Sequence, residues 1–165
     1  MNPLQKLQEF TSNNIIEKVV DFDPATDRLL PFDFTANNTE LTNEILGDTD
    51  VFAKWVEDAI AKSGARYGIG GYNEHRTIYS RSGHFDGLEE PRRLHLGVDV
   101  WGPAETAIYN FYDATVHSFK FNDNFGDYGA TIILKYQLND LVFHALYGHL
   151  SLGSLSGLVV GQQIP

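Results

Sequence analysis

The chain has 165 residues, a length typical of one domain with at most a small appended subdomain, and long enough to bury a hydrophobic core. Hydrophobic residues make up 42% and aromatic residues 13%, which is a globular composition and excludes a disordered chain. The formal net charge of −10 opposes binding to the phosphate backbone of nucleic acids. There are no cysteines, so disulfides and thiolate zinc sites are excluded, and any metal must be held by histidine, aspartate or glutamate.

The N-terminus lacks a basic stretch followed by an apolar run, which is the pattern of a secretory signal. No stretch reaches the roughly 18 consecutive apolar residues of a membrane-spanning helix. We therefore expect a soluble, cytoplasmic protein that binds neither a membrane nor nucleic acid, although a signal removed during cloning stays open.

The N-terminal part of the chain is expected to be helical. Apolar residues in 3–20 show loose helical spacing, residues 21–36 read as an irregular arm broken by prolines, and 39–46 reads as a short helix. The clearest helix covers residues 50–63, where apolar side chains recur at i, i+3, i+4 and i+7 and form one stripe. Gly64 is placed to end this helix in a left-handed conformation, and the stripe is expected to pack against the domain that follows.

The composition changes at residue 67, where glycine and aromatic residues rise and short β runs alternate with turn signals. Such close spacing favours antiparallel hairpins over βαβ units. We therefore expect an α+β fold in which residues 1–66 form a helical extension and residues 67–165 form a mainly antiparallel β-sheet sandwich or barrel. The candidate strands are 76–80, 92–96, 107–111, 114–121, 130–137, 141–147 and 157–160.

The first candidate for chemistry is the segment 95–99, which reads His-Leu-Gly-Val-Asp. Zinc binds imidazole nitrogen and carboxylate oxygen at about 2.0–2.2 Å, so His95 and Asp99 are candidate metal ligands. In a continuous strand, residues four apart lie too far apart to share one ion, but Gly97 permits a bend or a close approach of the backbone. A surface histidine and a turn aspartate form the alternative. We expect the flanking apolar side chains to bury the supports of this pair and to exclude water: Leu94, Leu96, Val98 and Val100.

The second candidate is His149, in the run Tyr-Gly-His-Leu at 147–150. In an extended strand, His149 would share one face with Tyr147 and lie on the face opposite His144. The neighbouring Gly148 would leave room for a substrate. A neutral histidine there could take a proton from metal-bound water or stabilise an oxyanion, and a structural histidine is the alternative.

Several motifs together resemble those of the lysostaphin-type (LytM-like) zinc metallo-endopeptidases, which cut peptide bonds in bacterial peptidoglycan. The resemblance extends from about residue 67 to the end of the chain. Its strongest elements are His-x-Gly-x-Asp at 95–99 and Tyr-x-His-Leu at 147–150. Weaker elements, with substitutions that include Glu105 in place of a glycine, are found at 72–76, 101–108, 113–116, 126–133 and 157–164.

The resemblance implies a peptidase fold, a zinc cofactor and a peptide as the partner that is bound and cleaved. It implies that His95 and Asp99 are zinc ligands and that His149 is catalytic. We add two candidate substrate-binding residues. Tyr147 would help to shape the cleft, with a structural role as the alternative. Arg76 would orient a carboxylate of the peptide through bidentate hydrogen bonds, with a surface ion pair as the alternative.

The resemblance is incomplete at the third zinc ligand. In the family this ligand is the second histidine of a His-x-His pair that follows the Gly-Gln-x-Ile segment, and no such pair occurs in this sequence. His84, in a loop, is the most favourable substitute. The other remaining histidines lie outside matching motifs: His75, His117 and His144. We expect a fragment whose ligand lies beyond Pro165, a defective relative, or a site completed by a symmetry partner.

The sequence therefore predicts a zinc-dependent metallo-endopeptidase that hydrolyses peptides of the peptidoglycan type. The alternative is a non-catalytic LytM-like module, lacking a complete metal site, that binds or regulates other proteins. A larger multi-domain protein or an oligomer as the context of the chain stays open. A carbohydrate-binding β-sandwich is poorly supported, because Trp55 lies in the helical region and Trp101 lies beside the metal motif.

Overall fold

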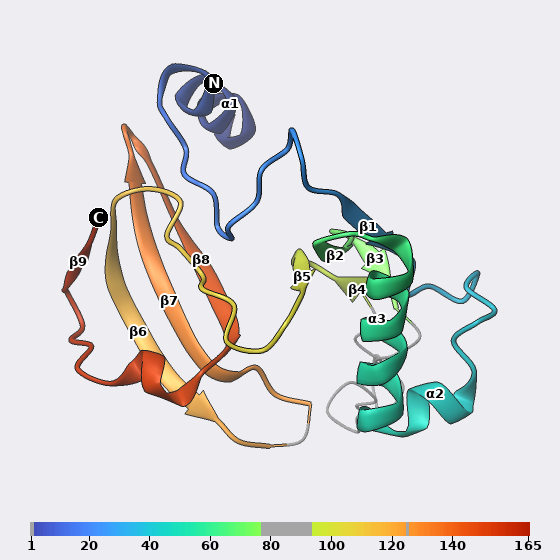
Figure 1. Cartoon of the computed structure of the whole chain (residues 1–165). Helices are drawn as coiled ribbons and strands as arrows, with labels where there is room; N and C mark the ends of the chain where they lie inside the picture. Colours follow the sequence, from blue (N-terminus) through green and yellow to red (C-terminus); the bar gives the residue numbers. More distant parts are fainter. Residues whose placement is uncertain (1, 77–93, 125) are drawn as a thin grey trace. The chain divides into compact units, whose positions relative to one another are not determined.

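The computed structural model describes residues 2–76, 94–124 and 126–165 (Figure 1). The chain has a mixed α+β fold with mainly antiparallel sheets, which confirms the coarse part of the predicted fold class, the α+β composition with antiparallel pairing.

The chain divides into two compact units. Unit 1 comprises Met1–Asp21 and Ala107–Pro165, and unit 2 comprises Phe22–Thr106. The boundary expected between residues 66 and 67 falls inside unit 2. The N-terminal helix belongs to the same unit as the C-terminal strands, because the chain returns to unit 1 after residue 106.

Unit 1 is built on a curved four-stranded antiparallel sheet in the order β8-β7-β6-β9 (Figure 1). The strands are β6 (Ala114–Asn122), β7 (Gly129–Leu138), β8 (Leu141–Leu150) and β9 (Gln163–Ile164). The three long strands confirm those predicted at 114–121, 130–137 and 141–147. A short 3₁₀ helix, η2 (Leu152–Leu155), follows β8.

Two of the predicted strands do not form. Residues 107–111 contribute one isolated β-bridge to the N-terminal arm and no strand. Residues 157–160 lie in turns, because Gly157 and Gly161 adopt positive φ angles of 77° and 88°. The chain forms its last strand after these turns, as β9, which pairs with the edge of β6 that β7 leaves open.

Helix α1 (Pro3–Asn13) is part of unit 1. It begins with a capping box, in which the backbone N–H of Gln5 donates to Asn2 Oδ1 at 2.9 Å and the backbone N–H of Asn2 donates to Gln5 Oε1 at 3.0 Å. Its Phe10 is buried in the core of the unit. Lys6 forms an ion pair with Asp140 in the turn between β7 and β8. The helix therefore contacts the sheet through the buried Phe10 and through this ion pair.

The core of unit 1 centres on Tyr136, which is fully buried. Its ring stacks on the rings of Phe111 and Phe143, with centroids 4.3 Å and 5.0 Å away. Its hydroxyl donates to Asn110 Oδ1 at 2.5 Å and lies 2.8 Å from the hydroxyl of Tyr147. Burial raises the pKa of both phenols above the ordinary value of tyrosine.

These two phenols make the stability of unit 1 sensitive to alkaline pH. An unfolded tyrosine loses its proton near pH 10, whereas the folded pair keeps its protons above that pH. The unfolded state then binds fewer protons, so the free energy of unfolding falls as the pH rises above about 10. Tyr136→Phe is expected to make this fall shallower, and to cost about 0.5–1.5 kcal/mol at neutral pH through its lost hydrogen bonds.

Urea titrations between pH 7 and 11, followed by methyl NMR signals of β7, measure both effects. Tyr109→Phe, at an exposed position of unit 1, is the matched control. A common pH dependence for the two variants would contradict the prediction.

Unit 2 contains a three-stranded sheet in the order β1-β2-β5, formed by β1 (Leu29–Phe32), β2 (Tyr67–Gly70) and β5 (Asp99–Trp101). β1 and β2 run parallel, and β2 and β5 run antiparallel. A separate antiparallel pair is formed by β3 (Glu74–His75) and β4 (Leu94–His95). The strands predicted at 76–80 and 92–96 fall only partly within the described residues.

Helices α2 (Asn43–Gly47) and α3 (Thr49–Ser63) complete unit 2. α3 confirms the helix predicted at 50–63. Asp48 caps its first turn, and Gly64 ends it with a left-handed φ of 68°. Its apolar stripe packs within unit 2, in an aromatic cluster that contains Phe32, Phe34, Phe52, Trp55 and Trp101. No helix within the described ranges is long and apolar enough to cross a membrane.

Candidate functional site

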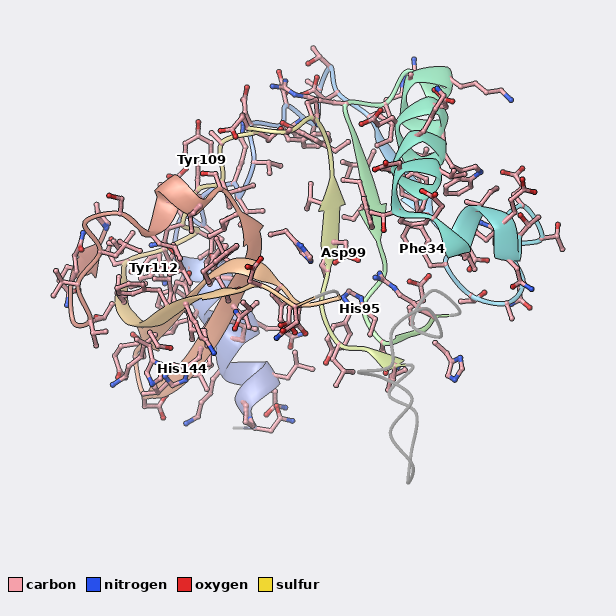
Figure 2. All side chains as sticks on the ribbon, turned by 90° about the horizontal axis from the view of Figure 1, so that it is seen from below. Phe34, His95, Asp99, Tyr109, Tyr112 and His144 are labelled. Carbon is pink, nitrogen blue, oxygen red and sulfur yellow. The ribbon has the colours of Figure 1, made fainter. Side chains whose placement is uncertain are left out.

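The structure brings His95 and Asp99 together in unit 2 (Figure 2). His95 ends β4, Asp99 begins β5, and the three residues between them bend the chain. His95 Nε2 lies 3.5 Å from Asp99 Oδ1. The other ring nitrogen, Nδ1, lies 3.2 Å from the carbonyl oxygen of Gly71. A carbonyl can only accept, so Nδ1 is the donor in this contact.

Gly97 provides the space that this arrangement needs. A Cβ at this position would lie 3.0 Å from His95 Nε2 and 3.3 Å from the neighbouring ring carbon Cε1. A side chain at residue 97 would therefore press on the nitrogen that faces Asp99. The sequence correctly singled out this glycine, for the close approach that it permits.

The prediction that the four flanking apolar side chains shield the His95–Asp99 pair from water is wrong. The side chains of Leu94, Leu96, Val98 and Val100 are all exposed, by between 40% and 62%. The reason is the alternation of the backbone, which turns the odd-numbered side chains, including those of His95 and Asp99, inward and the even-numbered ones outward.

The support of the pair comes instead from an arginine between two carboxylates. Arg76 is 4% exposed, and its Nε donates to Glu74 Oε2 at 2.6 Å. Its Nη1 donates to Asp99 Oδ2, the carboxylate oxygen that does not face His95. The guanidinium also lies over the ring of Phe34, 5.1 Å from its centroid. Arg76 is therefore in a buried ion-pair network, and not in the surface ion pair that the sequence left as the alternative.

Glu74 was missed by sequence reasoning. Its Oε1 accepts a hydrogen bond from the backbone N–H of Phe34 at 3.1 Å, so both of its oxygens are engaged. It lies directly opposite His95 in the pairing of β3 with β4. Glu74 and Arg76 are separated by one residue, which was the available signal for two side chains on one face of a short strand.

The donor atoms of His95 and Asp99 fit two ligands of one zinc ion. Two atoms, each about 2.0–2.2 Å from a tetrahedral ion, lie about 3.3–3.6 Å apart, and the observed separation of Nε2 and Oδ1 is 3.5 Å. The remaining polar atom of each side chain is held by an outer partner, the Gly71 carbonyl for His95 and Arg76 for Asp99. Such outer partners are typical of metal-binding histidines and carboxylates.

The third ligand is not found among residues 2–76, 94–124 and 126–165, where no group of three or more histidine, aspartate or glutamate side chains could share an ion. His84 lies outside the described residues. His117 and His144 both belong to unit 1, where their rings meet edge to face with centroids 4.7 Å apart. His75 is exposed on β3.

A substitution at Gly97 tests whether the space beside the His95 imidazole is needed for metal binding. For a zinc ion held between His95 and Asp99, Gly97→Ala is expected to weaken binding by about tenfold or more, because the new Cβ would press on the imidazole. Gly71→Ala is the matched control, since a Cβ there would meet no heavy atom within 4 Å and the carbonyl that His95 contacts is kept. Isothermal titration with zinc measures both, and equal affinities of the two variants would contradict the expectation.

His149 belongs to unit 1, and the prediction that it shares a face with Tyr147 is wrong. The pairing of β7 with β8 shifts between Tyr147 and Leu150, so that two residues of β8 stand opposite Thr131. His149 occupies this bulge with a positive φ of 55°. The alternation of side chains is therefore lost after Tyr147, and the argument that put His144 on the opposite face no longer applies.

The surroundings of His149 are formed by Tyr128. The backbone N–H of His149 donates to the carbonyl oxygen of Tyr128 at 2.6 Å, and the centroids of the two rings are 6.2 Å apart. The space above Gly148 is filled by the Tyr128 side chain, because a Cβ there would lie 3.2 Å from its ring, so the expected room for a substrate is not found at that point. The imidazole of His149 is exposed and forms no hydrogen bond in the described part of the chain.

Tyr147 is turned into the core of unit 1. Its hydroxyl lies 2.8 Å from that of Tyr136, and burial raises its pKa. This contact gives Tyr147 the structural role that the sequence left as an alternative.

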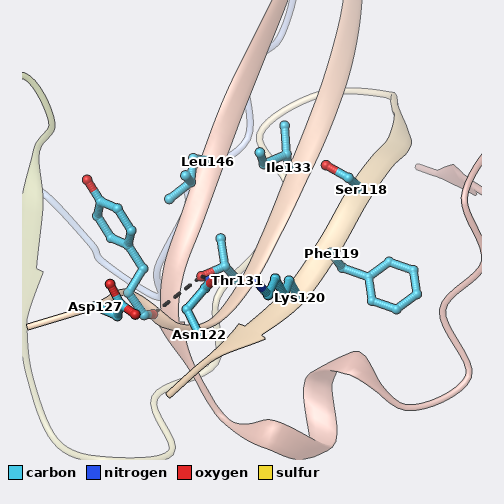
Figure 3. A pocket seen from close by; sticks show the side chains of 9 residues that line it. Ser118, Phe119, Lys120, Asn122, Asp127, Thr131, Ile133 and Leu146 are labelled. Carbon is cyan, nitrogen blue, oxygen red and sulfur yellow. Dashed lines mark hydrogen bonds between the residues drawn. The ribbon is translucent and has the colours of Figure 1, made fainter. Parts of the chain in front are cut away.

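A cavity of about 470 Å³ lies beside β6, β7 and β8 in unit 1 (Figure 3). Its polar part contains Lys120 and Asn122 of β6 and Asp127 of the following turn, and its apolar part contains Ile133 and Leu146. Tyr128, which also contacts His149, lines the same cavity. The volume falls within the range of small-ligand sites, and the lining combines a cation, a carboxylate, an amide and an apolar surface.

In comparisons with known proteins, no family model, no curated protein and no solved structure matches the chain.

Proposed function

We propose that the chain is a domain of a zinc-dependent endopeptidase of the lysostaphin (LytM-like) type, in which His95 and Asp99 are zinc ligands. The observation that carries the proposal is the 3.5 Å separation of His95 Nε2 and Asp99 Oδ1, with the second polar atom of each side chain bonded elsewhere. Bound zinc would supply a Lewis acid that polarises the scissile carbonyl and lowers the pKa of bound water.

The residues of the chain have separate parts in this proposal. His95 would bind the ion through Nε2, because Nδ1 donates to the Gly71 carbonyl. Asp99 contributes Oδ1 and one negative charge. For His149 the role in proton transfer comes from the resemblance alone, and its exposed imidazole forms no hydrogen bond among the described residues.

The experiment is hydrolysis of purified peptidoglycan, followed by the appearance of new amino termini. We expect activity that depends on added zinc, that is removed by a chelator, and that is lost in Asp99→Asn and His149→Ala. His144→Ala, which removes an exposed histidine from the same strand as His149, is the matched control. Hydrolysis that persists in the chelator or in Asp99→Asn would overturn the proposal.

A second candidate is a non-catalytic module that binds peptides. Two observations favour it: no third ligand is found in the described ranges, and the cavity beside β6–β8 offers a mixed polar and apolar lining. It predicts zinc-independent binding of an acidic peptide that weakens in Lys120→Gln. Lys135→Gln, an exposed lysine on the neighbouring strand, is the control. Peptide turnover that needs zinc would exclude this candidate.

A further inference from the structure

We infer that Arg76 is a positioning residue for the metal ligand Asp99, and that Glu74 is the partner that makes this role compatible with a cation site. The inference rests on the proposed zinc site and deepens it. It changes the role of Arg76 from a group that binds a substrate carboxylate to a group that orients a carboxylate of the chain.

The two oxygens of Asp99 have different partners. Oδ2 accepts a hydrogen bond from Arg76 Nη1, whereas Oδ1 lies 3.5 Å from His95 Nε2. A charge-assisted hydrogen bond to a guanidinium fixes the plane of a carboxylate more firmly than a bond to water. Arg76 therefore holds the carboxylate of Asp99 so that Oδ1 faces Nε2 of His95. These are the two atoms that would bind a metal ion.

Arg76 is itself held from three directions. Nε donates to Glu74 Oε2 at 2.6 Å, and the guanidinium lies over the Phe34 ring. Gly70 leaves the space for its third nitrogen, since a Cβ at that residue would lie 2.6 Å from Arg76 Nη2. Because Glu74 Oε1 is bonded to the Phe34 backbone, the arginine and its carboxylate partner are attached to the same segment of the aromatic cluster.

The charge of the network explains why a buried guanidinium need not repel a metal ion. Arg76 alone would cancel the negative charge of Asp99. With Glu74, the three side chains carry a net charge of −1, so a negative charge remains for the cation. Glu74 is thus required for the charge of the site, although its oxygens accept from the Phe34 backbone and from Arg76.

The alternative is that the network only stabilises the fold, as buried ion pairs elsewhere do. The test uses the whole chain and two metals. Zinc affinity is measured by isothermal titration, and the visible absorption of bound Co²⁺ reports the ligands around the ion. The variants are Arg76→Lys, which keeps the charge but loses the planar fork, and Glu74→Gln, which keeps the shape but loses the charge.

Arg66→Lys is the matched control, because Arg66 belongs to the same unit and pairs with Asp27, at 2.8 Å, and not with Asp99. We expect Arg76→Lys to weaken zinc binding about 10–100-fold, and Glu74→Gln about tenfold, with an altered Co²⁺ spectrum in each. Arg66→Lys should change neither. Far-ultraviolet circular dichroism confirms that each variant is folded.

The outcomes separate this inference from the proposed function. If the unaltered chain binds zinc and both network variants bind it equally well with the same Co²⁺ spectrum, Arg76 and Glu74 have only a structural role and the inference is overturned. If the unaltered chain binds no zinc, the proposed function is overturned, and this inference with it. If Arg76→Lys does not fold, Glu74→Gln decides the question alone.

Discussion

Asp99→Asn and His95→Ala are each expected to lower the zinc affinity of the proposed site by more than about 100-fold, since the loss of an outer partner alone costs about 10–100-fold. Asparagine keeps the shape of aspartate and can still accept a hydrogen bond from Arg76, so the change removes the charged oxygen that faces His95 without emptying the position. Equilibrium dialysis with zinc, at a fixed pH, measures the loss.

His144→Ala is the control for adventitious binding. The rings of His117 and His144 meet on the sheet of unit 1, and two exposed imidazoles can retain a metal ion without any catalytic site. The prediction holds if zinc is lost in the two unit 2 variants and kept in His144→Ala. The reverse pattern would assign the metal to the histidine pair.

Arg76→Leu is expected to lower the free energy of unfolding of unit 2 by about 3–5 kcal/mol. Removal of the guanidinium leaves the carboxylates of Glu74 and Asp99 partly buried without their cation. The fluorescence of Trp55 and Trp101 reports this unit, since both tryptophans of the chain belong to it, and urea titration gives the change.

Arg66→Leu provides the comparison for that prediction. The Arg66 side chain is 38% exposed in its pair with Asp27, and a pair with such exposure contributes about 0–1 kcal/mol. Equal effects of the two substitutions would show that burial of the Arg76 network has no energetic consequence, contrary to our expectation.

The parts of the fold that were predictable are those with local signals. The helix α3 was visible in its apolar stripe, and Gly64 marked its end because a left-handed residue follows the last turn. The long hairpins of unit 1 were visible in the spacing of β runs and turns. The division into units was not predictable, because unit 1 joins Met1–Asp21 to Ala107–Pro165 through contacts between residues far apart in sequence.

The site shows the same division between local and non-local information. The closeness of His95 and Asp99 follows from a local bend around Gly97, which the sequence displays. The residues that hold the pair in place do not follow from a local signal. They precede the pair by about twenty residues and reach it through strand pairing: Gly71, Glu74 and Arg76. The faces of β8 were misjudged because one bulge reverses the alternation on which the argument depended.

The proposed zinc site requires that His95 bind the ion through Nε2 while Nδ1 donates to the Gly71 carbonyl. Long-range ¹H–¹⁵N NMR of the ¹⁵N-labelled chain, with the His95 signals assigned from His95→Gln, tests it most directly. We predict a ring protonated at Nδ1 and a large shift of the Nε2 signal on addition of one equivalent of zinc, and this shift should be absent in Asp99→Asn. A ring protonated at Nε2, or zinc that shifts only the signals of His117 and His144, would contradict the account.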